Sequence, residues 1–178
     1  SLRCPFCQNC EIASARENTG RGRTGPAPIT YYEGRHERLL DTAFYSPRDL
    51  CDIALGLRDR GNLGIAFTYN EPLVGWEFVL DTAKLFHKEG MKQEELIDKE
   101  LEKGMKTVLV SNGMASQEVL HKILPYIDAM NIDLKGFTEE FYRDFVGGDL
   151  EMVKDFIRKA ADSCHIELTK LIIPDKND

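Results

Sequence analysis

The chain has 178 residues, of which 42% are hydrophobic and 30% charged, with a formal net charge of −7. This composition is typical of one soluble globular domain, and the negative charge argues against a nucleic-acid partner because such binding needs a basic face. No apolar run has the length of a membrane span and no signal peptide is recognisable, so we expect no membrane association. The five cysteines are odd in number and clustered at one end of the chain, so they do not make a disulfide framework, which indicates a reducing cytoplasm.

Three cysteines near the start of the chain are spaced by two residues each: Cys4, Cys7 and Cys10. Thiolates this close together are typical ligands of a soft metal or an iron–sulfur cluster, because a short loop can turn them all inward. The same spacing fits a structural zinc knot, a ferredoxin-like module or plain free thiols. The cysteines alone leave these alternatives open.

The segment 14–37 is rich in Arg, Gly, Thr and Pro and lacks an apolar period. At 20–25 it has the glycine spacing of a dinucleotide-binding motif, but no strand precedes the motif and no apolar helix follows it. We therefore interpret 14–37 as an exposed loop.

From Ser46 onward the sequence alternates between helix and strand patterns. Ser46 and Pro47 predict a helix start, and Gly61 predicts its end. Short apolar runs predict buried strands, and apolar residues at helical spacing between them predict helices. The predicted strands are 63–69, 106–111, 130–134 and 165–173, and the further predicted helices run from 76 to about 90, over 116–124, from 138 to about 147, and over 152–161.

This alternation predicts an α/β fold with parallel strands and right-handed crossovers. Polar residues stand at the carboxyl ends of three of the predicted strands, at 69–71, 111–112 and 133–135. Singly, each reads as a helix cap or a solvated turn. Together they favour a functional rim, because parallel α/β proteins carry their chemistry at that edge.

One segment interrupts the alternation. The pattern at 88–92 is nearly repeated at 102–106, with a charged, helix-forming stretch between the copies. We interpret 91–105 as an inserted helical segment or a continuation of the preceding helix, without chemistry of its own.

These motifs together resemble the radical S-adenosylmethionine (SAM) superfamily. Within it, the likeness is to the activating enzymes of glycyl-radical proteins, of the pyruvate formate-lyase activating enzyme kind, and to the AmmeMemoRadiSam proteins. It covers residues 2–178 apart from the loop and the insertion. The matched segments are 2–9, 68–72, 111–113, 133–135 and 171–174.

The resemblance implies a partial (β/α) barrel of parallel strands that forms one core domain over 1–178. About four of the family's six βα units are expected, with the barrel truncated at both ends. Asp175 stands where related chains have Gly, so a strained turn is expected there.

The resemblance also implies a 4Fe-4S cluster whose open iron binds SAM. Cys4 and Cys7 fit the second and third cysteines of the family's cluster motif, so the first is expected immediately before Ser1. Cys10 is then a bystander thiol or a weak candidate for a replacement ligand. Arg3 would add positive charge near the cluster or form a surface ion pair.

The other matched residues are expected around SAM. Phe6, beside Cys7, would lie against the adenine, and Asn70 with Glu71 would hold the methionine ammonium. The remaining polar groups of the ligand would contact Asn112, Asp133 and Lys135.

The implied reaction is the reductive cleavage of SAM to methionine and a 5′-deoxyadenosyl radical that abstracts a hydrogen atom. The expected partners are a glycyl-radical protein as substrate and a flavodoxin or ferredoxin as electron donor, in the cytoplasm. The alternative function is a ferredoxin-like or zinc-binding module that uses Cys4, Cys7 and Cys10.

Overall fold

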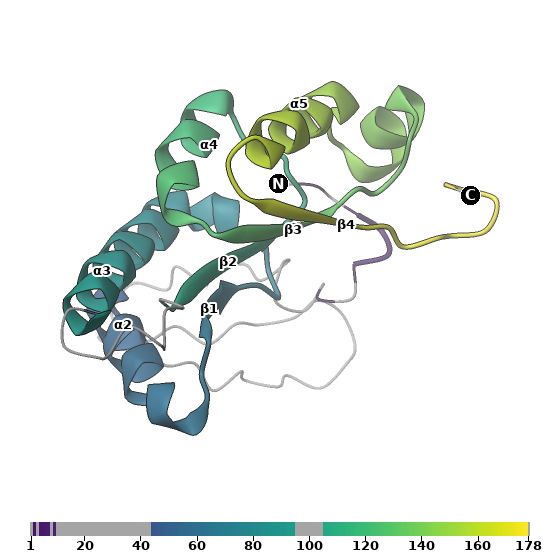
Figure 1. Ribbon diagram of the computed structural model, residues 1–178. Helices are drawn as coiled ribbons and strands as arrows, with labels where there is room; N and C mark the ends of the chain where they lie inside the picture. The colour runs from purple at the N-terminus through teal and green to yellow at the C-terminus, as the bar shows by residue number, and fades with distance from the viewer. Residues whose placement is uncertain (1, 3, 8, 10–43, 95–104, 178) are drawn as a thin grey trace, which may run out of the picture.

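The computed structural model describes residues 2, 4–7, 9, 44–94 and 105–177 of the chain (Figure 1). The predicted loop 14–37, with Arg3 and Cys10, lies outside these residues, and so does most of the predicted insertion 91–105. Within them, no helix has the length and hydropathy needed to cross a bilayer.

Within the described residues, four parallel strands form one sheet in the order β1-β2-β3-β4 (Figure 1). Their bounds are β1 Gly64–Phe67, β2 Lys106–Ser111, β3 Ala129–Asp133 and β4 His165–Thr169. All three pairings are parallel, which confirms the α/β prediction. The predicted strand 165–173 is too long, because the Ile173 N–H donates to the Asn177 side chain and the ladder on β3 stops at Thr169.

The longer helices follow the predicted order. They are α2 Pro47–Gly56, α3 Trp76–Glu94, α4 Gln117–Ile123 and α5 Leu150–Ala161. The shorter ones are η1 Arg58–Arg60, η2 Pro72–Gly75, η3 Leu124–Tyr126 and the π-helix η4 Phe141–Val146. The predicted stop near Gly90 is wrong, because α3 continues to Glu94, so the start of the segment 91–105 continues the preceding helix, one of the two predicted alternatives. One glycine inside a helix costs only about 1 kcal/mol.

Side-chain alternation places the hydrophobic core on one face of the sheet. Leu109, Met130 and Ile132 are fully buried and pack with Leu120 of α4 and Phe156 of α5. A second cluster joins Ile65 of β1 to α2 and α3, with Cys51, Ala54 and Phe86 at its centre. Burying each large side chain stabilises the fold by about 1.5–3 kcal/mol.

The four longer helices therefore cover the same face of the sheet (Figure 1). The opposite face, here called the inner face, carries the alternate side chains of each strand, including Val108, Val110 and Asn131. No helix of the described residues covers the inner face. The carboxyl ends of all four strands meet at one edge of the sheet, called the rim below.

Candidate functional site

The carboxylate of Glu71 joins the ends of β1 and β2. Its Oε2 accepts a hydrogen bond from the Asn112 backbone N–H at 2.8 Å, and its Oε1 accepts one from the Ser111 hydroxyl at 2.8 Å. Oε1 also accepts from the Leu73 N–H at 3.1 Å, which caps η2. Charge-assisted hydrogen bonds of this kind are about twice as strong as neutral ones, so they fix the spacing of the two strand ends.

The backbone before Glu71 is strained. Tyr69 has φ of 70°, a left-handed conformation that is a genuine outlier for a bulky side chain. Its neighbour Asn70 is exposed and accepts the Glu71 N–H on Oδ1 at 2.8 Å. Strain of this kind is retained at ligand sites more often than elsewhere.

After β2 the chain makes a tight turn at Gly113. Its φ of 72° favours glycine, and an added Cβ would lie 3.2 Å from Ile132 Cγ2 and 3.3 Å from Val153 Cγ1. Asn112 Oδ1 accepts the Met114 N–H at 2.9 Å across this turn. The turn therefore packs against both β3 and α5 while it presents Asn112 at the rim.

An ion pair stands at the end of β3. Lys135 Nζ lies 2.8 Å from Asp133 Oδ2, and the two side chains are 18% and 35% exposed. The Lys135 backbone N–H donates to the hydroxyl of Tyr142, at 3.0 Å. Tyr142 is fully buried, and that burial, with smaller contributions from Cys4 and Asp133, raises the pKa of its phenol.

The cysteine segment forms a turn beside this ion pair. The Cys7 N–H donates to the Cys4 carbonyl at 3.2 Å, and both cysteines are free thiols. Burial raises the pKa of the Cys4 thiol, Lys135 opposes that rise, and Cys7 and Asp133 add to it. Cys4 therefore lies within electrostatic reach of Cys7 and of both members of the Asp133–Lys135 pair.

Apolar contacts hold the cysteine turn on the π-helix η4. The ring of Phe6 stacks on Phe145 with 5.9 Å between centroids, and Phe145 contacts Phe141 at 5.1 Å. Leu2 packs so close to Gly148 that a Cβ there would lie 2.3 Å from Leu2 Cδ2. π-Helices are rare and frequently occur at functional sites.

The segment after β4 is tied to the same rim through Asn177, a buried residue. Its Nδ2 donates to the carbonyls of Lys135 at 2.6 Å and Leu171 at 2.8 Å, and its Oδ1 accepts the Ile173 N–H at 2.7 Å. Lys170 Nζ donates to the Asn177 carbonyl. Asp175 in this turn has φ of 61°, as the departure from Gly predicts.

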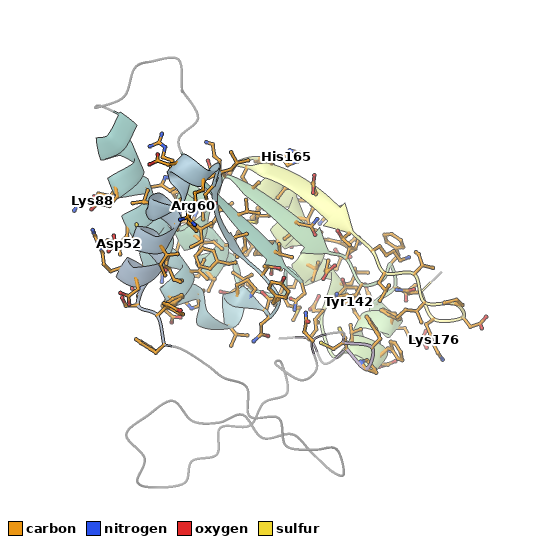
Figure 2. The ribbon with its side chains drawn as sticks, turned by 90° about the horizontal axis from the view of Figure 1, so that it is seen from below. Asp52, Arg60, Lys88, Tyr142, His165 and Lys176 are labelled. Carbon is orange, nitrogen blue, oxygen red and sulfur yellow. The ribbon has the colours of Figure 1, made fainter. Side chains whose placement is uncertain are left out.

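The structure thus brings most of the sequence-predicted site residues to one edge. Glu71 contacts Asn112, and Cys4 lies with Cys7, Asp133 and Lys135; Phe6 and Asn70 stand beside these two groups. Figure 2 views the molecule from the inner-face side and shows Tyr142 and Lys176 at the end of the sheet away from His165.

Sequence reasoning missed Tyr142, Phe145, Gly148 and Asn177. In the sequence, Gly147-Gly148 indicates only a helix break. The spacing of the aromatic residues in 141–145 signals a buried helical face, but nothing local shows that the Tyr142 hydroxyl reaches Lys135. For Asn177 the sequence offers no signal, because its partner lies 42 residues earlier.

The family model named Radical SAM superfamily matches residues 1–178 of the chain. The chain belongs to the Radical SAM superfamily. Among curated proteins, this radical SAM chain is 32% identical over 179 residues to the uncharacterized protein MJ0808 of Methanocaldococcus jannaschii; the match covers 100% of the chain and 42% of that protein. The chain therefore spans about two fifths of the length of that relative.

Among solved structures, the radical SAM chain is similar to a domain of pyruvate-formate lyase-activating enzyme from Bacteroides vulgatus. The two share a TM-score of 0.50 and 20% sequence identity, over 64% of this chain and 63% of that one. This likeness supports the fold, a parallel sheet of the radical SAM barrel type.

Proposed function

We propose that this chain is the catalytic core of a radical SAM enzyme of the activating-enzyme type. When bound, a 4Fe-4S cluster supplies one electron that cleaves SAM to methionine and a 5′-deoxyadenosyl radical, which takes a hydrogen atom from the substrate. One observation carries the proposal: the cysteine turn packs on the π-helix η4, and the Tyr142 hydroxyl of that helix accepts the Lys135 N–H beside the Asp133–Lys135 pair.

The donor chemistry of the turn fits such a cluster. Cys4 and Cys7 are unpaired thiols three residues apart on a tight turn, and thiolates are the ligands that iron–sulfur clusters use. Within the described residues no three potential ligands converge, so Cys4 and Cys7 are proposed as two members of a larger set. The Lys135 ammonium favours the Cys4 thiolate by opposing the effect of burial on its pKa.

The rim fits the polar end of SAM. Glu71 Oε2 accepts one hydrogen bond within the described residues and retains a lone pair for the methionine ammonium, beside the Asn70 side chain. Asn112, Asp133 and Lys135 are proposed to hold the remaining polar groups, with Lys135 suited to the methionine carboxylate. Phe6 is proposed to contact the adenine with the ring face not stacked on Phe145.

The named structural relative activates pyruvate formate-lyase, and this supports a protein substrate that carries a glycyl radical. We propose such a partner, a flavodoxin or ferredoxin as electron donor, and a cytoplasmic location. The alternative function remains a ferredoxin-like or zinc-binding module that uses Cys4, Cys7 and Cys10 without SAM.

The test is anaerobic reconstitution of the full-length protein with iron and sulfide. We expect bound iron and sulfide, an electron paramagnetic resonance signal on reduction that changes when SAM is added, and formation of 5′-deoxyadenosine. Cys4→Ala and Cys7→Ala should each abolish the signal. A preparation that binds zinc alone, or iron with no response to SAM, would overturn the proposal.

Cys10→Ala separates the two functions. If the radical SAM proposal holds, this variant keeps its cluster and its SAM response. Loss of the bound metal in Cys10→Ala, together with a wild-type cluster whose signal does not change when SAM is added, would favour the module.

A further inference from the structure

Side chains hold both backbone polar groups of Lys135. The Lys135 N–H donates to the Tyr142 hydroxyl at 3.0 Å, and the Lys135 carbonyl accepts a hydrogen bond from Asn177 Nδ2 at 2.6 Å. The two partners follow Lys135 by 7 and 42 residues, so neither bond belongs to a local turn. A loop residue that is anchored at both groups has little backbone freedom left. The fold therefore sets the position of the Lys135 backbone at the rim.

Tyr142 is itself held firmly. The residue is fully buried, at the end of the sheet away from His165 (Figure 2). Its N–H donates to the Thr138 carbonyl at 3.2 Å, and its carbonyl accepts the Gly148 N–H at 2.8 Å. A hydroxyl on such a support has a fixed position, so the Tyr142 hydroxyl passes the rigidity of η4 on to Lys135.

The Lys135 ammonium is partly ordered by the same strand end. It lies 2.8 Å from Asp133 Oδ2, and 18% of its side chain is exposed. Among the described residues this carboxylate is its one acceptor, which leaves two of the three ammonium protons for a ligand. Lysine side chains are flexible, and ordering them costs entropy when a ligand binds. A fixed backbone and the ion pair with Asp133 reduce that cost beforehand.

A carboxylate is the ligand group that a preordered ammonium suits. Hydrogen bonds from an ammonium to a carboxylate are about twice as strong as neutral ones, at distances of about 2.7–2.9 Å. A displaced ammonium no longer meets this distance and loses part of the interaction. The strength of the Lys135 interaction with a ligand therefore depends on what holds the Lys135 backbone.

We infer that Tyr142 is a positioning residue, whose hydroxyl holds the Lys135 backbone so that the ammonium meets the carboxylate of bound SAM. This inference rests on the proposed function and adds to the site a residue that acts only through Lys135. Without the hydroxyl, the partly buried Lys135 N–H loses its acceptor, and the loop shifts to satisfy it elsewhere. The ammonium shifts with the loop, and SAM binds more weakly.

A double-mutant cycle on the full-length protein, reconstituted with its cluster, tests this role. Tyr142→Phe removes the hydroxyl and keeps the ring, and it should raise the Kd of SAM about threefold to tenfold. Lys135→Met removes the ammonium and should raise the Kd about tenfold. Adding Tyr142→Phe to Lys135→Met should then change the Kd by less than about twofold. A purely structural role would give the same fold-change with and without the ammonium.

Tyr126→Phe is the matched control. Tyr126 lies in η3, before β3 and thus at the opposite end of the sheet, and its ring contacts His87 and Lys84. Loss of a hydroxyl there should leave the Kd of SAM unchanged. All Kd values are compared at equal iron and sulfide content per chain, so that a lost cluster does not pass for weak SAM binding.

The Lys135 amide gives a second readout, which needs neither iron nor SAM. In the metal-free protein its hydrogen exchange should be slow, and it should be about tenfold faster in Tyr142→Phe. The Thr107 amide is the internal control, because it also donates to a side chain, the Asp128 carboxylate, at 2.8 Å. Its exchange should be the same in both proteins. Rapid exchange of the Lys135 amide in the folded wild type would overturn the inference without any variant.

The cycle gives the inference its own way to fail. An unchanged Kd of SAM in Tyr142→Phe, or equal fold-changes with and without the Lys135 ammonium, would overturn the inference and leave the proposed function intact. A wild-type protein that holds no cluster or binds no SAM would overturn the proposed function, and this inference with it. The two failures are therefore distinguishable.

Discussion

Glu71 and Asn112, which are 41 residues apart, are joined by a 2.8 Å hydrogen bond from the Asn112 backbone N–H to the Glu71 carboxylate. The other carboxylate oxygen accepts from Ser111 and Leu73. One side chain therefore fixes the end of β1 to the end of β2 and caps the next helical turn. A ligand that binds Glu71 meets an oxygen whose position the fold has already set.

Glu71→Gln should destabilise the fold by about 1–3 kcal/mol. Each carboxylate oxygen accepts a backbone N–H, from Leu73 or from Asn112, so the amide nitrogen of Gln must face a donor in either orientation. Urea unfolding followed by circular dichroism measures the loss. Glu139→Gln, at an exposed position, is the control, and equal midpoints for the two variants would contradict the bridging role.

Gly113→Ala should cost more stability than Gly61→Ala. Both glycines have left-handed backbones, φ of 72° and 87°, which cost alanine about 1–2 kcal/mol. Only at Gly113 does the added methyl also meet Ile132 and Val153, at 3.2 and 3.3 Å, whereas Gly61 has open space. The difference in unfolding free energy between Gly113→Ala and Gly61→Ala measures the packing contribution. Equal losses of stability in the two variants would show that the contact with β3 and α5 is unimportant.

Gly148→Ala should loosen the cysteine turn. The new methyl would overlap Leu2 Cδ2, so Leu2 must leave its place and the contacts of the turn weaken. We expect faster alkylation of Cys4 in the metal-free protein and a modest loss of stability, about 1–3 kcal/mol. Gly75→Ala, where a methyl meets nothing within 4 Å, should change neither quantity. An unchanged alkylation rate in Gly148→Ala would mean that Leu2 does not anchor the turn.

Asn177→Asp should weaken SAM binding as well as stability. A carboxylate oxygen in place of Nδ2 would face the carbonyls of Lys135 and Leu171, which repels the loop that carries Lys135. We expect a loss of about 1–3 kcal/mol in stability and a higher Kd for SAM in the reconstituted protein.

The same chemical change at Asn62 is the matched control. Asn62 Nδ2 donates to the Ala54 carbonyl, and its Oδ1 accepts the Gly64 N–H, at the opposite end of the sheet. Asn62→Asp should lower stability and leave the SAM Kd of the folded protein unchanged. If both variants weaken SAM binding equally, Asn177 acts through global stability alone.

Acidification should remove the contribution of the α2 cap. Asp49 accepts hydrogen bonds from the Ser46 hydroxyl at 2.6 Å and the Ser46 N–H at 2.8 Å, and these bonds lower the pKa of its carboxyl. Because the folded pKa lies below the unfolded one, the contribution is complete above the unfolded value and is lost as pH falls through the folded value.

The measurement is the difference in unfolding free energy between the wild type and Asp49→Asn as a function of pH. It should be constant near neutrality and shrink at acid pH, below the ordinary range of aspartate. A difference that stays constant down to acid pH would show that the ionised carboxylate does not matter to the cap.

The fold was largely predictable because its signals are local. Apolar runs specify β2 within its exact bounds, and cap residues such as Ser46 and Ser116 mark the starts of α2 and α4. The end of β4 was not predictable, because the apolar residues 171–173 continue the strand pattern although the ladder on β3 stops at Thr169. The end of α3 was not predictable either, because Gly90 is a local helix breaker and yet lies inside the helix, which continues to Glu94.

The candidate site was predictable in its residues and less so in their contacts. Polar residues at the ends of parallel strands must share one edge, so Glu71, Asn112 and Asp133 were expected near one another. We did not expect the Glu71 carboxylate to accept hydrogen bonds from Ser111 and Asn112. The sequence pattern gives no signal for side-chain hydrogen bonds between residues about 40 positions apart. The roles of these residues toward SAM remain predictions.

The contacts of Tyr142 have a consequence for engineering. Its hydroxyl holds the Lys135 amide, while its ring and the Leu2 side chain converge on the space beside Gly148. Two loops that are remote in the chain thus share one rigid support. A chimera that imports the metal-binding loop of another superfamily member therefore needs a matching aromatic residue within η4 and a matching glycine after η4. Without both, the imported loop has no surface to pack against.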